Sequence, residues 1–191
     1  MNKEESLKVT NYKISWKSKR IFSTLKDYRD KIEKGEGVGS VRSYTNFLIV
    51  RVSPPFKGVY TIFESGFVNC TGLVTISDCN QAVRVYKQWF DHPPPLIEGF
   101  KIDCLSAHCN LGKKINLRQI QNKIKAPVNI IFAPEIFAGC IVRFLGVRGE
   151  GSASVFGNGK ITFVGGKCTN DIERIYNLLM LILNTSQAWQ T

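Results

Sequence analysis

Arginine, lysine, hydroxyl-bearing residues and phenylalanine alternate along several predicted strands of this chain. In the second half the alternating set is Phe137, Ile141, Arg143, Ser154, Phe156, Asn158, Lys160, Thr162 and Val164. In the first half it is Phe47, Ile49, Arg51, Thr61, Phe63, Ser65, Phe67, Asn69 and Thr71. Alternate residues of a strand point to the same face of a sheet, so we expect each set to share one face. An ordinary solvated face carries more charge and fewer phenylalanines, and this composition therefore indicates a surface that meets a partner.

The charge balance of the chain indicates what kind of partner that is. The chain has 26 lysines and arginines against 15 acidic residues, a formal net charge of +11. Such an excess predicts a polyanionic partner, and nucleic acid is the commonest one. An anionic membrane surface is the rival interpretation, but we find no basic amphipathic helix with a bulky aromatic face. The longest apolar run, Leu178 to Leu183, is far too short to span a bilayer, so we expect nucleic acid and no membrane.

Residues that commonly carry catalysis or bind metals are sparse. Cys104, His108 and Cys109 invite a zinc interpretation. On a strand, however, Cys104 and His108 share a face while Cys109 points away, and no second ligand pair follows. The other histidine is His92, and no serine–histidine–acid set, carboxylate pair or phosphate-binding loop is evident. The sequence therefore predicts a protein that is not an enzyme, with no metal, no cofactor and no small-molecule substrate.

Cysteine usage and the first residues of the chain bear on its compartment. The six cysteines have no framework spacing, and the segment from Met1 to Glu5 lacks the apolar run of a secretory signal. We therefore expect reduced thiols and a location in the cytosol or the nucleus.

The chain repeats itself at an interval of about 93 residues. Ile49-Val50-Arg51-Val52 corresponds to Ile141-Val142-Arg143-Phe144, and the segment from Ile62 to Gly66 corresponds to that from Val155 to Gly159. We therefore predict a tandem duplication with its join near Pro93-Pro94-Pro95. The predicted domains are an N-terminal extension (1–6), a first repeat (7–95), a second repeat (96–184) and a C-terminal tail (185–191).

Periodicity and turn residues predict the same order of elements in both repeats. The predicted strands and helices that open the repeats are Val9–Trp16 with Ile21–Lys34, and Ile102–Leu111 with Leu117–Ile124. Strands at Asn46–Val52 and Cys140–Phe144 are followed by breaker-rich loops (53–58 and 146–151) and by hairpins turning at 64–66 and 157–159. The closing helices are Asn80–Phe90 and Asn170–Leu183, the latter capped by Thr169 or Asn170 with Asp171.

One repeat therefore has the predicted order β-α-β-β-β-α. Two such repeats predict an α+β fold, with one antiparallel sheet and with helices on one face only. The opposite face, left open, must meet either water or a partner.

Three segments of the chain resemble the TATA-binding protein family. The segment from Ala133 to Phe144 is similar to the family's Glu-Pro-Glu-Leu-Phe-Pro-Gly-Leu-Ile-Tyr-Arg-Met. Val155 to Lys160 is similar to its Ile-Phe-Val-Ser-Gly-Lys, and Ile62 to Gly72 to its Ile-Phe-Ser-Ser-Gly-Lys-Met-Val-Cys-Thr-Gly. The similarity runs from Leu7 to Leu183 and is weak in the first helix, as in a divergent member encoded by a virus or a fast-evolving eukaryotic parasite.

The resemblance implies a fold and a mode of DNA binding. The fold is a two-repeat saddle with a continuous curved antiparallel sheet and helices on its convex face. The family lays the concave sheet on the minor groove of double-stranded, A:T-rich promoter DNA and bends it by driving phenylalanines between base steps. Phe63, Phe137 and Phe156 match three of these wedges. The fourth position falls on Thr45 if Arg51 stays in register, with Tyr44 and Phe47 as possible substitutes.

The resemblance also assigns contacts to phosphates and bases. Phosphate-contacting positions correspond to Arg51, Arg143, Lys160 and Lys167, with Thr162 on the same face. Asn11 and Thr71 match polar residues that touch base edges. In the second repeat their places hold Cys104 and Val164, which cannot make the same hydrogen bonds, and Phe67 replaces a lysine. We therefore expect an A:T preference that depends more on groove shape than on base reading.

Protein partners follow from the same resemblance. Glu135, beside Ile136, matches a loop position that general transcription factor IIB touches, so IIB-like and IIA-like factors and the RNA polymerase machinery are the implied partners. A basic helix face is either solvated charge or a further partner surface; it consists of Lys19, Arg20, Lys26, Arg29, Lys31 and Lys34. The expected location is the nucleus, or a cytoplasmic viral factory if a virus encodes the chain. A second interpretation stays open: the same fold as a protein-interaction adaptor or regulator with weak or non-specific DNA binding.

Overall fold

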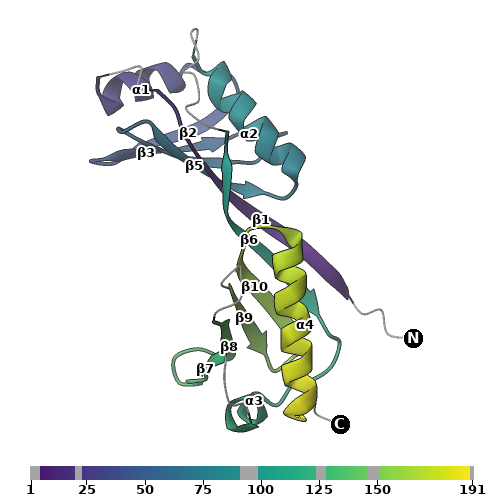
Figure 1. Cartoon of the computed structure of the whole chain (residues 1–191). Coiled ribbons are helices and arrows are strands. Elements are labelled where there is room, and N and C mark those ends of the chain that lie inside the picture. Colours follow the sequence, from purple (N-terminus) through teal and green to yellow (C-terminus); the bar gives the residue numbers. More distant parts are fainter. Residues whose placement is uncertain (1–4, 20–22, 91–98, 124–127, 146–150, 190–191) are drawn as a thin grey trace. The chain divides into compact units, whose positions relative to one another are not determined.

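The computed structural model describes residues 5–19, 23–90, 99–123, 128–145 and 151–189 (Figure 1). The chain forms two compact units. The first-repeat unit comprises Asn11–Asp103, and the second-repeat unit comprises Met1–Thr10 together with Cys104–Thr191. The predicted join at Pro93-Pro94-Pro95 lies outside the described residues, and the domain limits drawn from the repeat stay a prediction.

In its described residues, the first-repeat unit contains five strands and two helices. Its elements are β1 (Glu5–Lys17), α1 (Leu25–Ile32), β2 (Val38–Ser43), β3 (Phe47–Val52), β4 (Val59–Phe63), β5 (Phe67–Leu73) and α2 (Ile76–Gln88). Its strands follow the order β2-β3-β4-β5-β1, and the pairs are antiparallel. Residues of β1 up to Thr10 belong to the second-repeat unit.

The second-repeat unit has the same order of elements. They are β6 (Lys101–Asn110), α3 (Leu117–Lys123), β7 (Val128–Ile131), β8 (Gly139–Phe144), β9 (Gly151–Phe156), β10 (Lys160–Gly166) and α4 (Thr169–Thr185). The first residues of β6, up to Asp103, belong to the first-repeat unit. The first residues of β1 belong to this unit, and β6 is the neighbour of β1 in the sheet. The remaining strands follow the order β6-β10-β9-β8-β7. These pairs are antiparallel as well.

The order β-α-β-β-β-α predicted for each repeat is wrong by one strand. The structure adds β2 in the first repeat and β7 in the second, each at an edge of its sheet. Val38-Gly39-Ser40-Val41-Arg42-Ser43 carries glycine and serine, which are poor strand formers, and only two half-buried valines. A strand that pairs on one side and buries little apolar surface leaves a weak sequence pattern.

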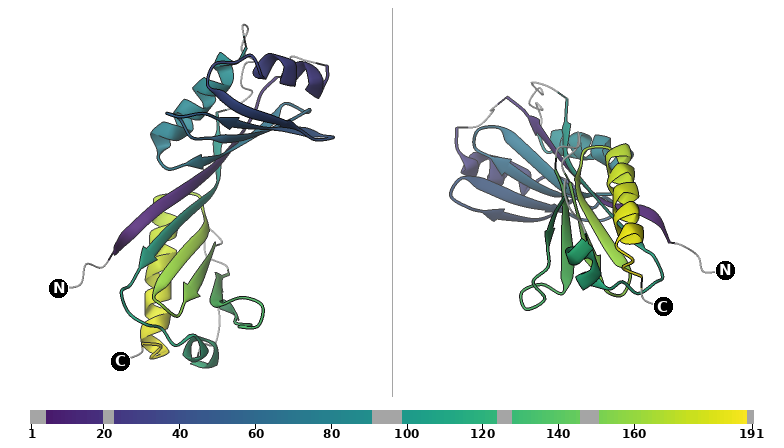
Figure 2. Two further views of the ribbon diagram at one scale, coloured as in Figure 1. Left: turned by 180° about the vertical axis from the view of Figure 1, so that it is seen from behind. Right: turned by 60° about the horizontal axis from the view of Figure 1, so that its bottom comes forward.

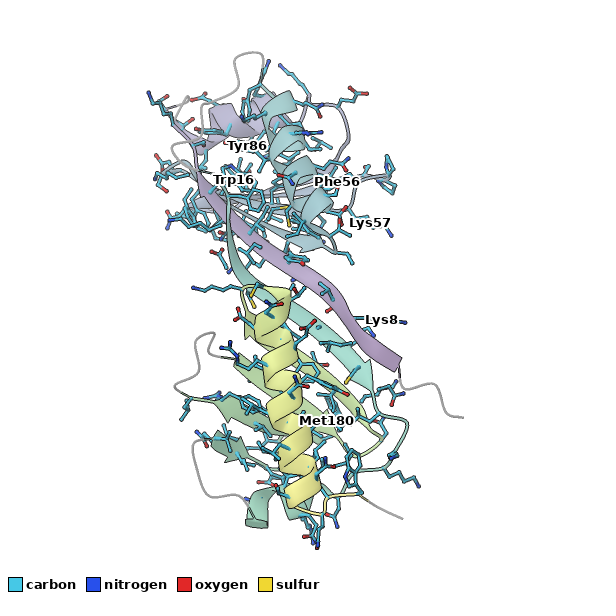
Figure 3. All side chains as sticks on the ribbon, turned by 45° about the vertical axis from the view of Figure 1, so that its right-hand side comes forward. Lys8, Trp16, Phe56, Lys57, Tyr86 and Met180 are labelled. Carbon is cyan, nitrogen blue, oxygen red and sulfur yellow. The ribbon has the colours of Figure 1, made fainter. Side chains whose placement is uncertain are left out.

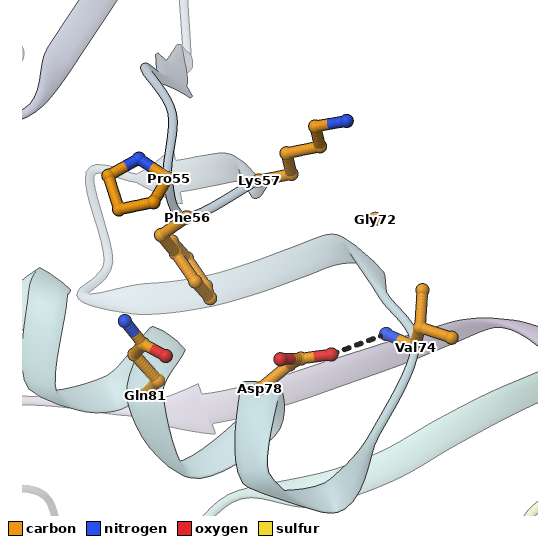
Figure 4. A pocket seen from close by; sticks show the side chains of 7 residues that line it. All are labelled: Pro55, Phe56, Lys57, Gly72, Val74, Asp78 and Gln81. Carbon is orange, nitrogen blue, oxygen red and sulfur yellow. Dashed lines mark hydrogen bonds between the residues drawn. The ribbon is translucent and has the colours of Figure 1, made fainter.

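In each of the two long helices, an aspartate of the first turn accepts hydrogen bonds from backbone N–H groups of the preceding residues. Val74 and Thr75 donate to the carboxylate of Asp78 at 3.0 and 2.8 Å, which starts α2 at Ile76 rather than at the predicted Asn80 (Figure 4). Lys167 and Cys168 donate to Asp171 at 2.9 and 3.2 Å. The N-cap of α4 is therefore Cys168 rather than Thr169 or Asn170.

The limits of α1 and α3 also differ from the prediction. The helix α1 is shorter than the predicted Ile21–Lys34, and its predicted first residues lie outside the described part of the chain. The helix α3 ends at Lys123, where the described segment also ends, so the predicted Ile124 is not covered.

The two units have differently composed cores. In the first-repeat unit, the rings of Trp16 and Tyr86 lie 5.5 Å apart edge to face, as labelled in Figure 3, and Tyr60 and Trp89 lie 4.9 Å apart. In the second-repeat unit, the residues about 93 positions after Trp16 and Tyr86 are Cys109 and Leu179, which are also buried. Equivalent positions are thus filled by aromatic rings in one unit and by smaller side chains in the other.

Within the described residues, helices pack on one face of each unit's sheet. In Figures 1 and 2, α4 lies along β9 and β10, and α1 and α2 lie on one side of their strands. The predicted core set faces the helices and is buried: Val142, Phe144, Val155, Ile161 and Phe163. The mixed sets predicted for the other side are exposed or half-buried. We call this helix-free side the open face of each unit.

Candidate nucleic-acid interface

The open face of the first-repeat unit carries a cluster of four aromatic rings. Phe47 on β3 lies directly opposite Phe63 on β4, and their ring centroids are 5.7 Å apart. Phe67 lies 6.1 Å from Phe63, and Tyr44 stacks on Phe47 at 4.7 Å with an interplanar angle of 19°. We call these residues the first tip cluster. Of the three candidates for the fourth wedge, Phe47 is thus the one that pairs with Phe63, and Tyr44 extends the pair.

The open face of the second-repeat unit carries a pair of rings instead. Phe137 and Phe156 lie 5.6 Å apart edge to face. The residue opposite Phe156 in the register is not Phe137 but Gly139. A Cβ atom built on Gly139 would lie 2.6 Å from Cε1 of Phe137, so the ring of Phe137 occupies the space that a side chain at 139 would need. We call Phe137 and Phe156 the second tip pair.

Exposed arginines occupy the same register in both units. Arg51 lies opposite Val59, and Arg143 lies opposite Ser152. Both arginines belong to the open faces. The strand of Arg51, β3, contains Phe47, and the strand of Arg143, β8, begins two residues after Phe137. Lys160 and Thr162 on β10 are exposed on the open face of the second-repeat unit. A guanidinium in such a position can bind a phosphate in two-pronged geometry.

Arg42 is an open-face residue that the sequence did not single out. It is exposed and lies opposite Ile49 in the β2–β3 pair. It was missed because β2 itself was missed. The signal that could have found it is the polar pair Thr45-Asn46 before the apolar run of β3, since such a turn implies a partner strand on its other side.

The predicted base-contacting residues of the first repeat lie close together. The Gly72 N–H donates to Oδ1 of Asn11 at 2.7 Å, which leaves the two N–H donors of the Asn11 amide available. Thr71 directly precedes Gly72 in the chain. Gly72 itself has a φ of 86°, a backbone conformation that favours glycine. In the second repeat, the thiol of half-buried Cys104 bonds its neighbour's carbonyl, and Val164 is 40 % exposed.

Besides Phe137, the predicted site residues Lys167, Glu135 and Ile136 lie outside the strands. Lys167 is exposed between β10 and α4, where its N–H caps the helix. Glu135 and Ile136 lie in the turn that precedes β8, in which Ile136 N–H bonds the Ala133 carbonyl at 2.9 Å. Ile136 is 84 % exposed, an unusual position for a large apolar side chain.

The described residues hold no group of three or more metal-binding side chains. Burial raises the pKa of the Cys70 thiol to about 12, and it raises the pKa of the Cys140 thiol to about 11. Both thiols are therefore protonated near neutral pH and are poor nucleophiles. A pocket beside β5 is lined by Pro55, Phe56, Lys57, Gly72, Val74, Asp78 and Gln81 (Figure 4). Asp78 is the one acidic group of that lining, and it is engaged in capping α2.

None of the helices in the described part of the chain combines the length and the apolar character that crossing a membrane requires.

Comparisons with a family model, with relatives and with a solved structure all find similarity to TATA-binding proteins. Residues 99–186 match the family described as transcription factor TFIID (or TATA-binding protein, TBP). The TATA-box-binding protein of Archaeoglobus fulgidus is 31 % identical over 135 residues, which cover 67 % of this chain and 72 % of the relative. The TATA-box-binding protein-like 1 of Entamoeba histolytica is 30 % identical over 143 residues, and the match spans 64 % of that relative's length.

The solved structure of Methanococcus jannaschii TBP is also similar to this structure. It has a TM-score of 0.75 and 25 % sequence identity, and the match covers 94 % of this chain and 98 % of that one. This similarity confirms the α+β two-repeat fold class that the sequence predicts.

Proposed function

Since the chain belongs to the TATA-binding protein family, we propose that it is a transcription initiation factor that binds double-stranded DNA through its open faces and bends it. Members of this family are DNA-binding transcription factors without catalytic activity. The family binds DNA by inserting apolar wedges into the minor groove, and we propose the same mode of binding for this chain because it belongs to the family.

The observation that carries the proposal is the match between the two open faces. Each has exposed or half-buried phenylalanines in contact and an exposed arginine on the adjoining strand, at equivalent register. Soluble proteins rarely leave aromatic clusters on a surface that has no partner. Rings beside guanidinium groups suit a ligand that offers both base planes and phosphates.

Charge supports the same ligand. The net charge of +11 favours a polyanion, and exposed Arg42, Arg51, Arg143 and Lys160 place part of that charge on the open faces. We propose A:T-rich promoter-like duplexes as the preferred sites, because their narrow minor groove attracts arginine and their pyrimidine–purine steps open easily.

We further propose that Glu135 and Ile136 contact a IIB-like factor. The two residues form an exposed acidic and apolar pair in one turn. IIA-like factors and the RNA polymerase machinery are the other proposed partners, and the nucleus is the proposed location.

The test is a titration of A:T-rich and random duplexes, followed by fluorescence anisotropy at several salt concentrations. We expect tighter binding to the A:T-rich duplex and a fall in log K with log salt. Arg51→Ala and Arg143→Ala should each reduce the magnitude of that slope by about one. The matched control is Arg84→Ala on α2, which should leave the slope unchanged. Absence of binding at low salt would overturn the proposal.

The adaptor interpretation has one observation in its favour. Large apolar side chains are exposed outside the open faces, including Ile136, Val74 at 50 % and Leu181 at 60 %. Binding with a steep salt slope but without preference for A:T-rich DNA, and without bending, would favour that second function.

A further inference from the structure

Polar side chains form a row across three adjacent strands of each open face. In the first-repeat unit, Thr61 on β4 lies opposite Asn69 on β5, which lies opposite Ser15 on β1. We call Thr61, Asn69 and Ser15 the first polar row.

The second-repeat unit has a row at the same place in the register. Ser154 on β9 lies opposite Thr162 on β10, which lies opposite His108 on β6. Each member of this second polar row follows its counterpart in the first by about 93 positions. The duplication therefore gives each half of the molecule a row of hydrogen-bonding groups. These rows are distinct from the Asn11–Thr71 pair.

The two rows differ in how accessible they are. Ser15 is only 4 % exposed, and its hydroxyl donates to Asp103 at 2.9 Å, so the first row is closed at one end. Oδ1 of Asn69 is buried without a hydrogen-bond partner among the described residues. In the second row, Thr162 and His108 are exposed and Ser154 is half-buried. The second row is therefore the more open of the two.

The chemistry of these side chains selects a ligand group. A threonine or serine hydroxyl both donates and accepts, and a neutral imidazole does the same through its two nitrogens. In the minor groove an A·T pair offers only acceptors, whereas a G·C pair adds the N2 amino donor of guanine. An apolar floor would bury that amine without a partner, at a cost. A hydroxyl can accept from it.

We propose that the second polar row contacts base edges and accepts hydrogen bonds from guanine N2, so that this chain binds sites containing a G·C pair over that row. The proposal rests on the proposed function, because it presupposes that the open faces meet the minor groove. Cys104 and Val164 cannot make the hydrogen bonds of the Asn11–Thr71 pair. The proposal therefore places base recognition by the second repeat in Ser154, Thr162 and His108.

Inosine provides the probe that isolates the amine. An I·C pair lacks the N2 amino group and so presents acceptors alone in the minor groove. The experiment compares duplexes that differ at one base pair at a time, carrying A·T, I·C or G·C at that position. At the position over the second row we expect G·C to bind about threefold to tenfold more tightly than I·C. Weaker binding of G·C than of I·C at every position would overturn the proposal.

Thr162→Val tests the second row directly, because valine has the shape of threonine without the hydroxyl. The variant should bring the G·C to I·C ratio to about one at the position over this row. Ser154→Ala should lower the same ratio. The matched control is Thr169→Val, at the exposed start of α4, which should keep the wild-type ratio.

The outcomes separate this inference from the proposed function. A Thr162→Val protein with the wild-type ratio would overturn the role of the row and leave DNA binding intact. Failure of the wild-type protein to bind any duplex at low salt would overturn both.

Discussion

The two repeats bring aromatic rings together on their open faces by different routes. In the first tip cluster, Phe47 and Phe63 are direct cross-strand partners. In the second tip pair, the partner of Phe156 is Gly139, and Phe137, two residues earlier, covers the glycine with its ring. The arginine positions stay aligned, since Arg51 lies four residues after Phe47 on β3 and Arg143 lies four residues after Gly139 on β8. One surface can thus be built from different positions as long as the rings reach the same place.

The two repeats also differ in the composition of their cores, and we expect them to have different roles in DNA binding. Aromatic residues fill the core of the first-repeat unit and its tip, with Tyr44 and Phe67 added to the central pair. The second-repeat unit has two tip rings and a mainly aliphatic core, but the more open polar row. We therefore expect the first tip to contribute more to bending and the second unit to contribute more to base recognition.

The largest effect should come from Phe63→Ala, because Phe63 contacts both Phe47 and Phe67. We expect affinity for an A:T-rich duplex to fall roughly tenfold to a hundredfold, since stacking of a base on an aromatic side chain is worth about 1–3 kcal/mol. Phe156→Ala should cost less. Bend angles from energy transfer between the duplex ends measure the difference, and Lys160→Ala should change the bend least. Equal bends for all three variants would argue against wedges.

Gly139→Ala should affect the second tip alone. The new methyl group would meet the ring of Phe137 at 2.6 Å and the ring of Phe156 at 3.2 Å, so the packing of the two rings must change. We expect the bend to fall to about the value of Phe137→Ala, with a several-fold loss of affinity. Gly157→Ala is the control in the same unit, because a Cβ there has ordinary contacts, the nearest at 3.5 Å. A wild-type bend in Gly139→Ala would contradict the packing argument.

Restoring the polar pair of the second repeat should raise affinity by a smaller factor. In Cys104→Asn with Val164→Thr, the new amide can accept from Gly165 N–H as Asn11 accepts from Gly72. One added hydrogen bond is worth about 1 kcal/mol, so we expect roughly fivefold tighter binding to an A:T-rich duplex. The reverse exchange in the first repeat, Asn11→Cys with Thr71→Val, should weaken it. An unchanged dissociation constant in both variants would mean that neither pair touches bases.

The smallest difference between the repeats should lie in the aspartates of the helix caps, because Asp78 and Asp171 each accept hydrogen bonds from two backbone N–H groups. Asp78→Ala and Asp171→Ala should each lower the free energy of unfolding by about 1 kcal/mol, as measured by urea denaturation. The control is Asp30→Ala, at an exposed position on α1. A clear inequality between the two cap variants would show that the caps are not equivalent.

The same caps should weaken in acid. The Val74 N–H lowers the pKa of Asp78, and the Lys167 N–H lowers that of Asp171, from the ordinary value of 3.8. Because both pKa values are lower in the folded state, the carboxylates stabilise the fold fully above the unfolded value. That contribution is lost as the pH falls through the folded values. Urea denaturation at neutral pH and below pH 3.8 should show the effect of each cap substitution shrinking in acid.

Sequence periodicity determined the duplication, the open and covered faces, and the hairpin turns at Gly66 and Gly159, both with positive φ. These features depend on residues close together in the chain: alternation along a strand, and glycine where the backbone turns. The family motifs were equally local. The pattern of each segment was therefore enough to place Phe63, Phe156, Arg51 and Arg143 on their faces.

Only the tertiary structure decided which residues face each other across strands. The pairing of Phe47 with Phe63, the space over Gly139, the edge strands β2 and β7 with Arg42, and the polar rows all depend on register. Register is fixed by hydrogen bonds between segments distant in sequence, and a shift of one residue would move every side chain to the opposite face. A single strand's pattern does not contain that information, because it specifies the face of a residue but not its neighbour on the next strand.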